Sequence, residues 1–94
     1  MAIARVVEFE GVSQDRIEAL TRELEEDGPR DDVPASSILM LHDPEAGKSV
    51  AILIFETTED YDRADATLNA MPSDDTPGRR TSVSRYNVAL HRTR

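Results

Sequence analysis

The two histidines are the side chains in this sequence best suited to acid–base chemistry near neutral pH. His42 and His91 each lie near the end of a segment expected to form a strand, where a general base or a metal ligand could sit. The strand order inferred below places these segments at opposite edges of one sheet, so a shared metal site would require two copies of the chain. His42 precedes Asp43 in a turn-like sequence, and we favour a solvated turn there over a functional histidine. We retain His42 as a candidate catalytic residue and expect no metal site and no cofactor.

Arginines near the C-terminus could bind an anion. Arg79 and Arg80 follow a Pro-Gly pair, and Arg85 comes shortly after them. Guanidinium groups bind carboxylates and phenolates through two parallel hydrogen bonds. Pairing with nearby surface carboxylates such as Asp74 and Asp75 is the alternative, and it contributes little. We favour that alternative for Arg79 and Arg80 and keep Arg85 as a candidate ligand-binding residue.

The second expected helix carries further candidates. Its apolar stripe includes Tyr61, Leu68 and Met71, so the first interpretation is that all three side chains pack in the core. If a pocket opens between this helix and the sheet, the same three side chains would line it and bind the ligand. Asn69 lies off the stripe, where it is either exposed or placed to assist proton transfer, and it is the second candidate catalytic residue.

The amino-acid composition limits the classes of protein to which the chain can belong. The chain has 94 residues, enough for a single domain over residues 1–94, with 19 acidic against 11 basic residues and a formal net charge of −8. This charge repels phosphate backbones and anionic lipid, so we expect no nucleic-acid partner and no membrane partner. The absence of cysteine excludes disulfides and thiolate chemistry. Because no signal peptide or membrane-spanning segment is apparent, a cytoplasmic location is expected.

The segments that must position these side chains follow from hydrophobic patterning. Val50–Phe55 contains six consecutive apolar residues, and Ile38–Leu41 just upstream is equally apolar, so both predict strands buried on two faces. Ser13 and Thr57 or Thr58 are candidate N-caps for two amphipathic helices, which end at Gly28 and Pro72. The six expected elements are strand Ile3–Phe9, a first helix, strands at 36–42 and 49–56, a second helix, and strand Thr81–His91.

This β-α-β-β-α-β order is the ferredoxin-like α+β arrangement, a four-stranded antiparallel sheet with two helices on one face. Thr76–Arg79, with proline and then glycine at its centre, is expected to form a type II turn before the last strand. Both crossover connections are right-handed, which puts both helices on the same face of the sheet. The other face would leave several large apolar side chains in water, so we expect a second copy of the chain to cover it. Shielding of this face by the chain's own loops or C-terminal segment is the alternative.

A pairing of the first and last strands can also be proposed. An antiparallel register in which residue numbers sum to 93 makes one face mostly large and apolar, as a helix-packed face should be. The other face then pairs Glu8 with Arg85 and Val6 with Asn87. On this prediction Glu8, Arg85 and Asn87 share a face that contributes to ligand binding.

With this element order, length and pattern of doubly apolar strands, the chain resembles the dimeric α/β-barrel superfamily over nearly its whole length, from Ile3 to about Arg92. That superfamily includes the antibiotic-biosynthesis-monooxygenase-like and stress-responsive barrel families. The resemblance implies a homodimer joined through the sheets and a pocket for a small aromatic molecule, in some members oxidised by O₂ without a cofactor. The chain departs from the monooxygenases by lacking tryptophan, and it has no histidine on its second helix, where haem-degrading members place their ligand.

The sequence leads to two hypotheses about the function. In the first, the homodimer binds a small, partly aromatic molecule and acts on it as a cofactor-independent monooxygenase or isomerase. Arg85 would then hold an anionic oxygen and Tyr61 would hydrogen-bond the substrate. In the second, the homodimer is a non-catalytic ligand sensor or a structural partner. An enclosed pocket with converging polar groups would favour the first hypothesis, and a barrel whose interior is filled by side chains would favour the second.

Overall fold

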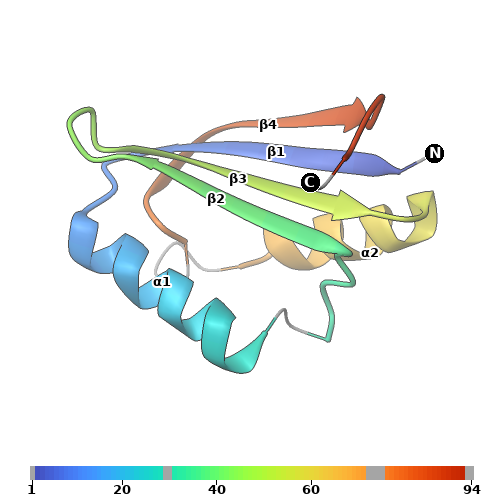
Figure 1. The fold of residues 1–94 in the computed structure, drawn as a ribbon, viewed down its shortest axis with the longest axis horizontal. Helices are drawn as coiled ribbons and strands as arrows, with labels where there is room; N and C mark the ends of the chain where they lie inside the picture. Colours follow the sequence, from blue (N-terminus) through green and yellow to red (C-terminus); the bar gives the residue numbers. More distant parts are fainter. Residues whose placement is uncertain (1, 29–30, 72–75, 93–94) are drawn as a thin grey trace.

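The computed structural model describes residues 2–28, 31–71 and 76–92. The elements in chain order are β1 (Ile3–Glu10), α1 (Gln14–Asp27), β2 (Ser37–Asp43), β3 (Lys48–Phe55), α2 (Thr58–Asn69) and β4 (Arg79–Asn87). The strands form one antiparallel sheet in the order β2-β3-β1-β4. Both helices lie on one side of this sheet (Figure 1). The predicted ferredoxin-like α+β fold is therefore confirmed.

Both helices begin at the caps that the sequence indicates. The Ser13 hydroxyl accepts a hydrogen bond from the Arg16 amide at 3.2 Å, and the Thr57 hydroxyl accepts one from the Asp60 amide at 3.1 Å. Each cap satisfies an amide that the first turn of a helix leaves without a partner. The first helix ends at Gly28, as predicted, with a φ of 70° that suits glycine. The second ends at Asn69, and Pro72 lies outside the described residues.

The core lies between the sheet and the helices. Side chains alternate along each strand, so every second residue of β1 and β3 points toward α1 and α2. Each large apolar side chain buried there stabilises the fold by about 1.5–3 kcal/mol. The core cluster consists of Ile3, Val7, Phe9, Val12, Ile17, Val33, Ala51, Leu53, Phe55, Tyr61 and Ala64.

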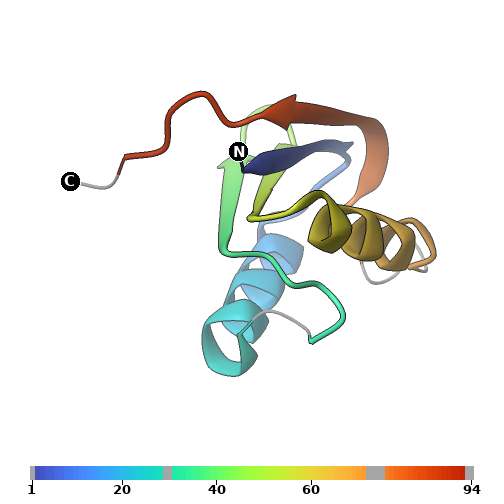
Figure 2. The ribbon, with the colours of Figure 1, turned by 90° about the vertical axis from the view of Figure 1, so that its right-hand side faces the viewer.

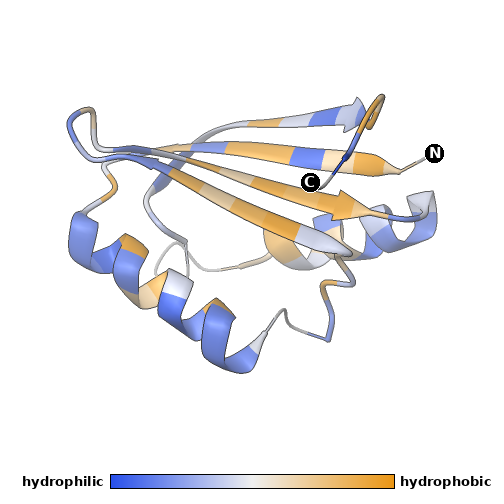
Figure 3. Cartoon of the chain, viewed as in Figure 1, coloured by the Kyte–Doolittle hydropathy of each residue, from blue (hydrophilic) through white to orange (hydrophobic). Residues whose placement is uncertain are grey.

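The other side of the sheet, here called the outer face, carries no helix. Leu39 and Leu41 of β2 and Tyr86 of β4 are 52%, 46% and 58% exposed on it. Between these edges lie Ile52 and Ile54 of β3, both half-buried. Figure 3 shows hydrophobic residues along the strands and mainly hydrophilic ones along α1. The single chain thus leaves an apolar surface uncovered, as the doubly apolar strands predict.

The predicted register between the first and last strands is wrong by three residues. Ile3 pairs with Asn87, and Glu8 pairs with Ser82 instead of Arg85. An odd shift moves every side chain of β4 to the opposite face, so Arg85 points toward the helices. The error arose because β4 begins at Arg79 and ends at Asn87, earlier than the predicted Thr81–His91.

Gly78 is required at the start of β4, but not for the predicted reason. A type II turn needs a positive φ at Gly78, and the glycines with positive φ are Gly11, Gly28 and Gly47. The type II turn is therefore wrong. A Cβ atom at position 78 would instead lie 2.4 Å from the Glu10 carbonyl oxygen. Glycine lets β4 approach the end of β1 closely enough to begin pairing two residues earlier than expected.

Candidate functional site

A polar stripe on α2 faces β1 and β4. Tyr61, Asp65 and Asn69 recur at intervals of four residues and so lie along one side of the helix. The Tyr61 ring is buried and meets the Phe55 ring of β3 edge-on, with the ring centroids 5.7 Å apart. This contact fixes the first turn of α2 against the sheet and so positions the two polar residues that follow.

Arg5 of β1 is buried beneath this stripe, with only 3% of its surface exposed. Its Nε donates to Asp65 Oδ1 at 2.9 Å, and its Nη2 donates to Asn69 Oδ1 at 3.0 Å. Asn69 Nδ2 in turn donates to Asp65 Oδ2 at 3.2 Å. A buried guanidinium requires such partners, because an unpaired buried charge is very costly. The three side chains therefore form one hydrogen-bonded unit.

Two further arginines of β4 reach the same unit. Arg85 lies directly opposite Arg5 across the β1–β4 pair, and its guanidinium carbon is 4.7 Å from the centre of the Tyr61 ring. Arg80 donates from Nη1 to Asn69 Oδ1 at 2.8 Å. We call Arg5, Arg80 and Arg85, with Tyr61, Asp65 and Asn69, the arginine cluster.

The arginine cluster contains more positive than negative side chains. In the described part of the chain, Arg5 forms an ion pair with Asp65, whereas Arg80 and Arg85 form none within 4 Å. Like charges directly opposite one another on neighbouring strands are destabilising, and Arg5 and Arg85 occupy such positions. In a protein with a net charge of −8, this is a local concentration of positive charge that could hold an anion.

The Tyr61 phenol stays protonated in this setting. Burial raises the pKa of Tyr61, and the nearby Asp65 carboxylate adds to the shift, while Arg5 and Arg85 oppose it. At neutral pH the phenol is therefore neutral. It can donate a hydrogen bond to an anion but is a poor base.

Several predicted site residues do come together. Tyr61, Asn69 and Arg85 meet in the arginine cluster, and Leu68 packs, half-buried, against the core beneath it. Met71 is half-buried just beyond the end of α2, where its amide donates to the Leu68 carbonyl oxygen at 3.3 Å.

Two residues of the arginine cluster, Arg5 and Asp65, were not predicted from the sequence, and a third, Arg80, was expected on the surface. Arg5 is an arginine at a helix-facing position in an otherwise apolar strand, and Asp65 is four residues from both Tyr61 and Asn69. Those two signals could have found the ion pair. Arg80 was expected to pair with surface carboxylates, and its contact with Asn69 depends on the register of β4.

Glu8 and Asn87 do not share a face with each other as predicted. Glu8 lies on the outer face, where its carboxylate accepts a hydrogen bond from the Ser82 hydroxyl at 2.6 Å. Asn87, opposite Ile3 at the end of β4, is on the helix-covered side of the sheet together with Arg85. The three-residue shift in register separates Glu8 from the other two.

The histidines are also remote from the cluster. His42 lies on β2, which is separated from β4 by β3 and β1, so it is not positioned to act together with Asn69. Its Nε2 atom is buried and has no hydrogen-bond partner among the described residues. His91 is exposed beyond the end of β4. Within residues 2–28, 31–71 and 76–92, no group of three or more His, Asp or Glu side chains could hold a metal ion.

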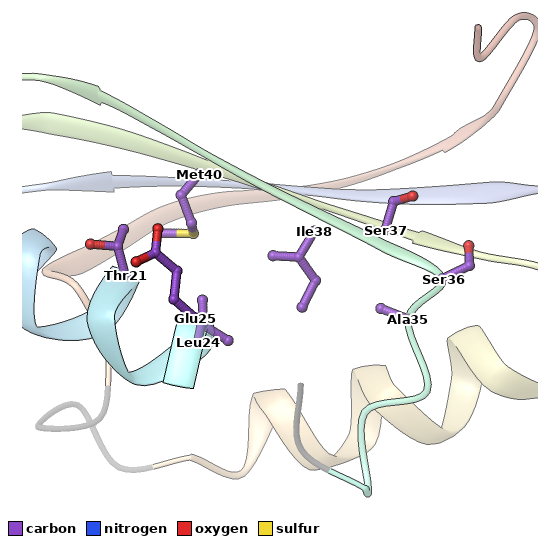
Figure 4. A pocket seen from close by; sticks show the side chains of 8 residues that line it. All are labelled: Thr21, Leu24, Glu25, Ala35, Ser36, Ser37, Ile38 and Met40. Carbon is purple, nitrogen blue, oxygen red and sulfur yellow. The ribbon is translucent and has the colours of Figure 1, made fainter. Parts of the chain in front are cut away.

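A pocket of about 410 Å³ opens on the other half of the molecule, between α1 and β2 (Figure 4). It lies against the first helix, whereas the conditional prediction from the sequence concerned a pocket between the second helix and the sheet. Its lining mixes apolar side chains with hydroxyl groups and one carboxylate. The lining residues are Thr21, Leu24, Glu25, Ala35, Ser36, Ser37, Ile38 and Met40.

Comparison with known proteins supports the fold. The sequence matches no protein-family model, and no curated protein matches it. A structure of Rv0793 from Mycobacterium tuberculosis is similar, with a TM-score of 0.58 and 13% identity, covering 99% of this chain and 100% of that one. At this identity the similarity shows the shared α+β fold alone. In the described part of the chain, neither helix is long and apolar enough to cross a membrane.

Proposed function

We propose that this protein is a homodimer of the dimeric α/β-barrel type that binds a small molecule carrying an anionic oxygen. The observation that carries the ligand class is the arginine cluster, in which Arg5 and Arg85 lie directly opposite each other while the one carboxylate of the cluster, Asp65, is paired with Arg5. A carboxylate or phenolate bound beside Arg85 relieves this repulsion and gains charge-assisted hydrogen bonds.

The same surface offers a place for the body of the ligand. Arg80, Val83 and Arg85 follow one another on the helix-facing side of β4, and Val83 is 40% exposed. An aromatic ring resting on Val83 would be flanked by guanidinium groups on both sides. The neutral Tyr61 phenol adds a hydrogen-bond donor. These features favour a flat aromatic acid over an aliphatic one.

The homodimer is proposed from the outer face of the sheet. Leu39, Leu41 and Tyr86 are about half exposed there, and each would contribute up to about 1.5–3 kcal/mol if a partner covered it. A second copy presents the same apolar surface, so a two-fold arrangement satisfies both subunits at once.

Binding is a better-supported role than catalysis. Among the residues predicted to be catalytic, Asn69 lies in the arginine cluster, but His42 is on the far edge strand. Asp65 is occupied by Arg5, and the Tyr61 phenol is neutral. No base in the cluster is therefore ready to accept a proton from a ligand. We propose a ligand sensor or carrier.

The ligand proposal is tested by NMR titration with benzoate, using benzamide as the uncharged control. Benzoate should shift the amide signals of Val83 and Arg85, and benzamide should not. Arg85→Ala should weaken benzoate binding about tenfold, since it removes one charge-assisted bidentate contact. Arg63→Ala, on the exposed side of α2, changes the charge equally and should leave binding unchanged. Equal binding of benzoate and benzamide would refute an anion site.

The dimer is tested by sedimentation velocity at micromolar concentration. The unmodified chain should sediment as a dimer, and Leu39→Glu should sediment as a monomer because it buries a charge in the interface. Ala19→Glu, at an exposed position of α1, is the matched control and should remain dimeric. A monomeric unmodified chain would refute the proposal.

A further inference from the structure

The segment that follows β4 leaves the body of the chain. The Val88 amide donates to the Ala2 carbonyl oxygen at 2.9 Å, and the segment then extends away from the sheet (Figure 2). Leu90, in the middle of this segment, is 83% exposed. Among the exposed large apolar side chains of the described residues it is the most accessible, and its own chain does not cover it.

The α1–β2 pocket has the complementary properties. Leu24, Ile38 and Met40 supply apolar wall, and Glu25, which is exposed, contributes a carboxylate to the lining (Figure 4). The last turn of α1 contains no basic residue to balance its acidic ones, and the C-terminal end of a helix is itself partially negative. The pocket therefore suits an apolar side chain that is followed by a positive charge.

Val88–Arg92 has that sequence. Leu90 is followed by His91 and then by Arg92, whose side chain is exposed. Docking of this segment would cover Leu90 and bring the guanidinium of Arg92 to the acidic end of α1. Apolar surface would meet apolar surface, and positive charge would meet negative charge.

The strand order disfavours this docking within one chain and is compatible with it between two. Ile3 pairs with both Asn87 and Phe55, and Ser37 pairs with Ile54, so β4 ends at the same end of the sheet where β2 begins. However, β2 and β4 are opposite edges, separated by three strand spacings of about 4.8 Å each. A two-fold axis that runs along the strands, between two stacked outer faces, places the end of the partner's β4 over the outer side of β2 without exchanging the ends of the sheets. The pocket lies on the helix-covered side of β2, to which Ile38 and Met40 point, so the partner's segment would pass around this edge strand to enter it.

We propose that Val88–Arg92 of each subunit docks into the α1–β2 pocket of the other, with the partner's Leu90 in the pocket and the partner's Arg92 beside Glu25. This inference rests on the homodimer proposed above, and it makes the pocket a composite site that needs two copies of the chain. The occupant of the pocket is thus a protein segment and not a small molecule.

The full chain lacks cysteine, so engineered disulfides can test this contact directly. Ala35→Cys, in the pocket lining and against the core cluster, and Leu90→Cys are prepared as separate proteins, mixed and mildly oxidised. We expect a disulfide-linked species that contains one chain of each variant, which only a contact between subunits can produce. Gln14→Cys, at the other end of α1, replaces Ala35→Cys as the control and should not link to Leu90→Cys.

Dimer dissociation constants provide a second, independent measurement. Leu90→Ala should raise the dissociation constant about tenfold or more, because burial of the side chain is lost in two symmetric contacts. Glu25→Arg and Arg92→Glu should each weaken the dimer, and the double variant should recover most of the loss. This recovery would identify the pairing of Glu25 with Arg92.

The outcomes separate this inference from the proposed homodimer. A dimer that forms no Ala35→Cys to Leu90→Cys disulfide and tolerates Leu90→Ala overturns the docked segment and leaves the dimer intact. A chain that is monomeric at all concentrations overturns both. A small molecule that co-purifies in native mass spectrometry and is lost on substitution of Ile38, without any such disulfide, assigns the pocket to a ligand and overturns the docked segment.

Discussion

The two helices contact the sheet in different ways. The second helix, α2, is held by directional contacts, because Asp65 pairs with the buried Arg5 and Tyr61 meets Phe55 edge-on. The first helix, α1, has one buried residue, Ile17, and its Leu24 lines an open pocket against β2. Thus α2 supports a fixed polar site, whereas α1 leaves an open pocket in which another group can bind.

The difference follows from the side chains on the two helix faces. Ala64 of α2 is completely buried, and its small size lets the helix lie close to the sheet. At this short distance an arginine of β1 can reach both Asp65 and Asn69. The apolar stripe of α1 carries Leu20 and Leu24, which are only half-buried. These side chains do not fill the space between the C-terminal half of α1 and β2, and the pocket opens there.

The largest effect expected from this comparison concerns stability. Tyr61→Ala should lower the free energy of unfolding by about 3–5 kcal/mol, because a buried aromatic ring and its contacts are lost. Leu24→Ala, in the last turn of α1, should cost only about 1–2 kcal/mol, because that side chain is half-buried. Urea unfolding monitored by circular dichroism measures both. Equal losses would show that the two helices are held equally tightly.

A smaller loss in the free energy of unfolding is expected when the ion pair beneath α2 is removed. Arg5→Met should cost about 2 kcal/mol, less than a fully buried pair, because the Asp65 side chain is 33% exposed and keeps some solvation. Adding Asp65→Leu should recover much of this loss, since no carboxylate is then left without a partner. A double variant less stable than Arg5→Met alone would show that Asp65 stabilises α2 through contacts other than the ion pair.

The smallest effect is a dependence of stability on pH. Because folding raises the pKa of Tyr61, the unfolded chain loses this proton first as the pH rises. The contribution of Tyr61 is therefore present below the usual tyrosine pKa of 10.0 and is lost as the pH rises through the higher value of the folded state. Tyr61→Phe should flatten this decline in unfolding experiments between about pH 8 and 11. Tyr86→Phe, on the exposed outer face, should leave the decline unchanged.

Local chemistry along the chain was sufficient to predict most of the fold. Ser13, Thr57 and Gly28 mark helix ends through contacts within a few residues, so their roles can be inferred without the rest of the structure. The apolar run in β3 likewise indicates burial on two faces wherever the strand is placed. The candidate site could be predicted only in part from the sequence, because Tyr61, Asn69 and Arg85 were identified one by one and not as neighbours.

The order of the elements, the helix caps and the apolar outer face can be inferred from the amino-acid sequence, because they depend on periodicity and on contacts between residues close in the chain. The register of β4, and with it the face on which Arg85 lies, is known only from the folded structure. That register depends on the absence of a side chain at Gly78 and on an irregularity between Glu8 and Phe9, which no pattern in the sequence reveals. The meeting of Arg5 with Arg85 is a consequence of that register, since a shift of one residue would have turned Arg85 to the other side of the sheet.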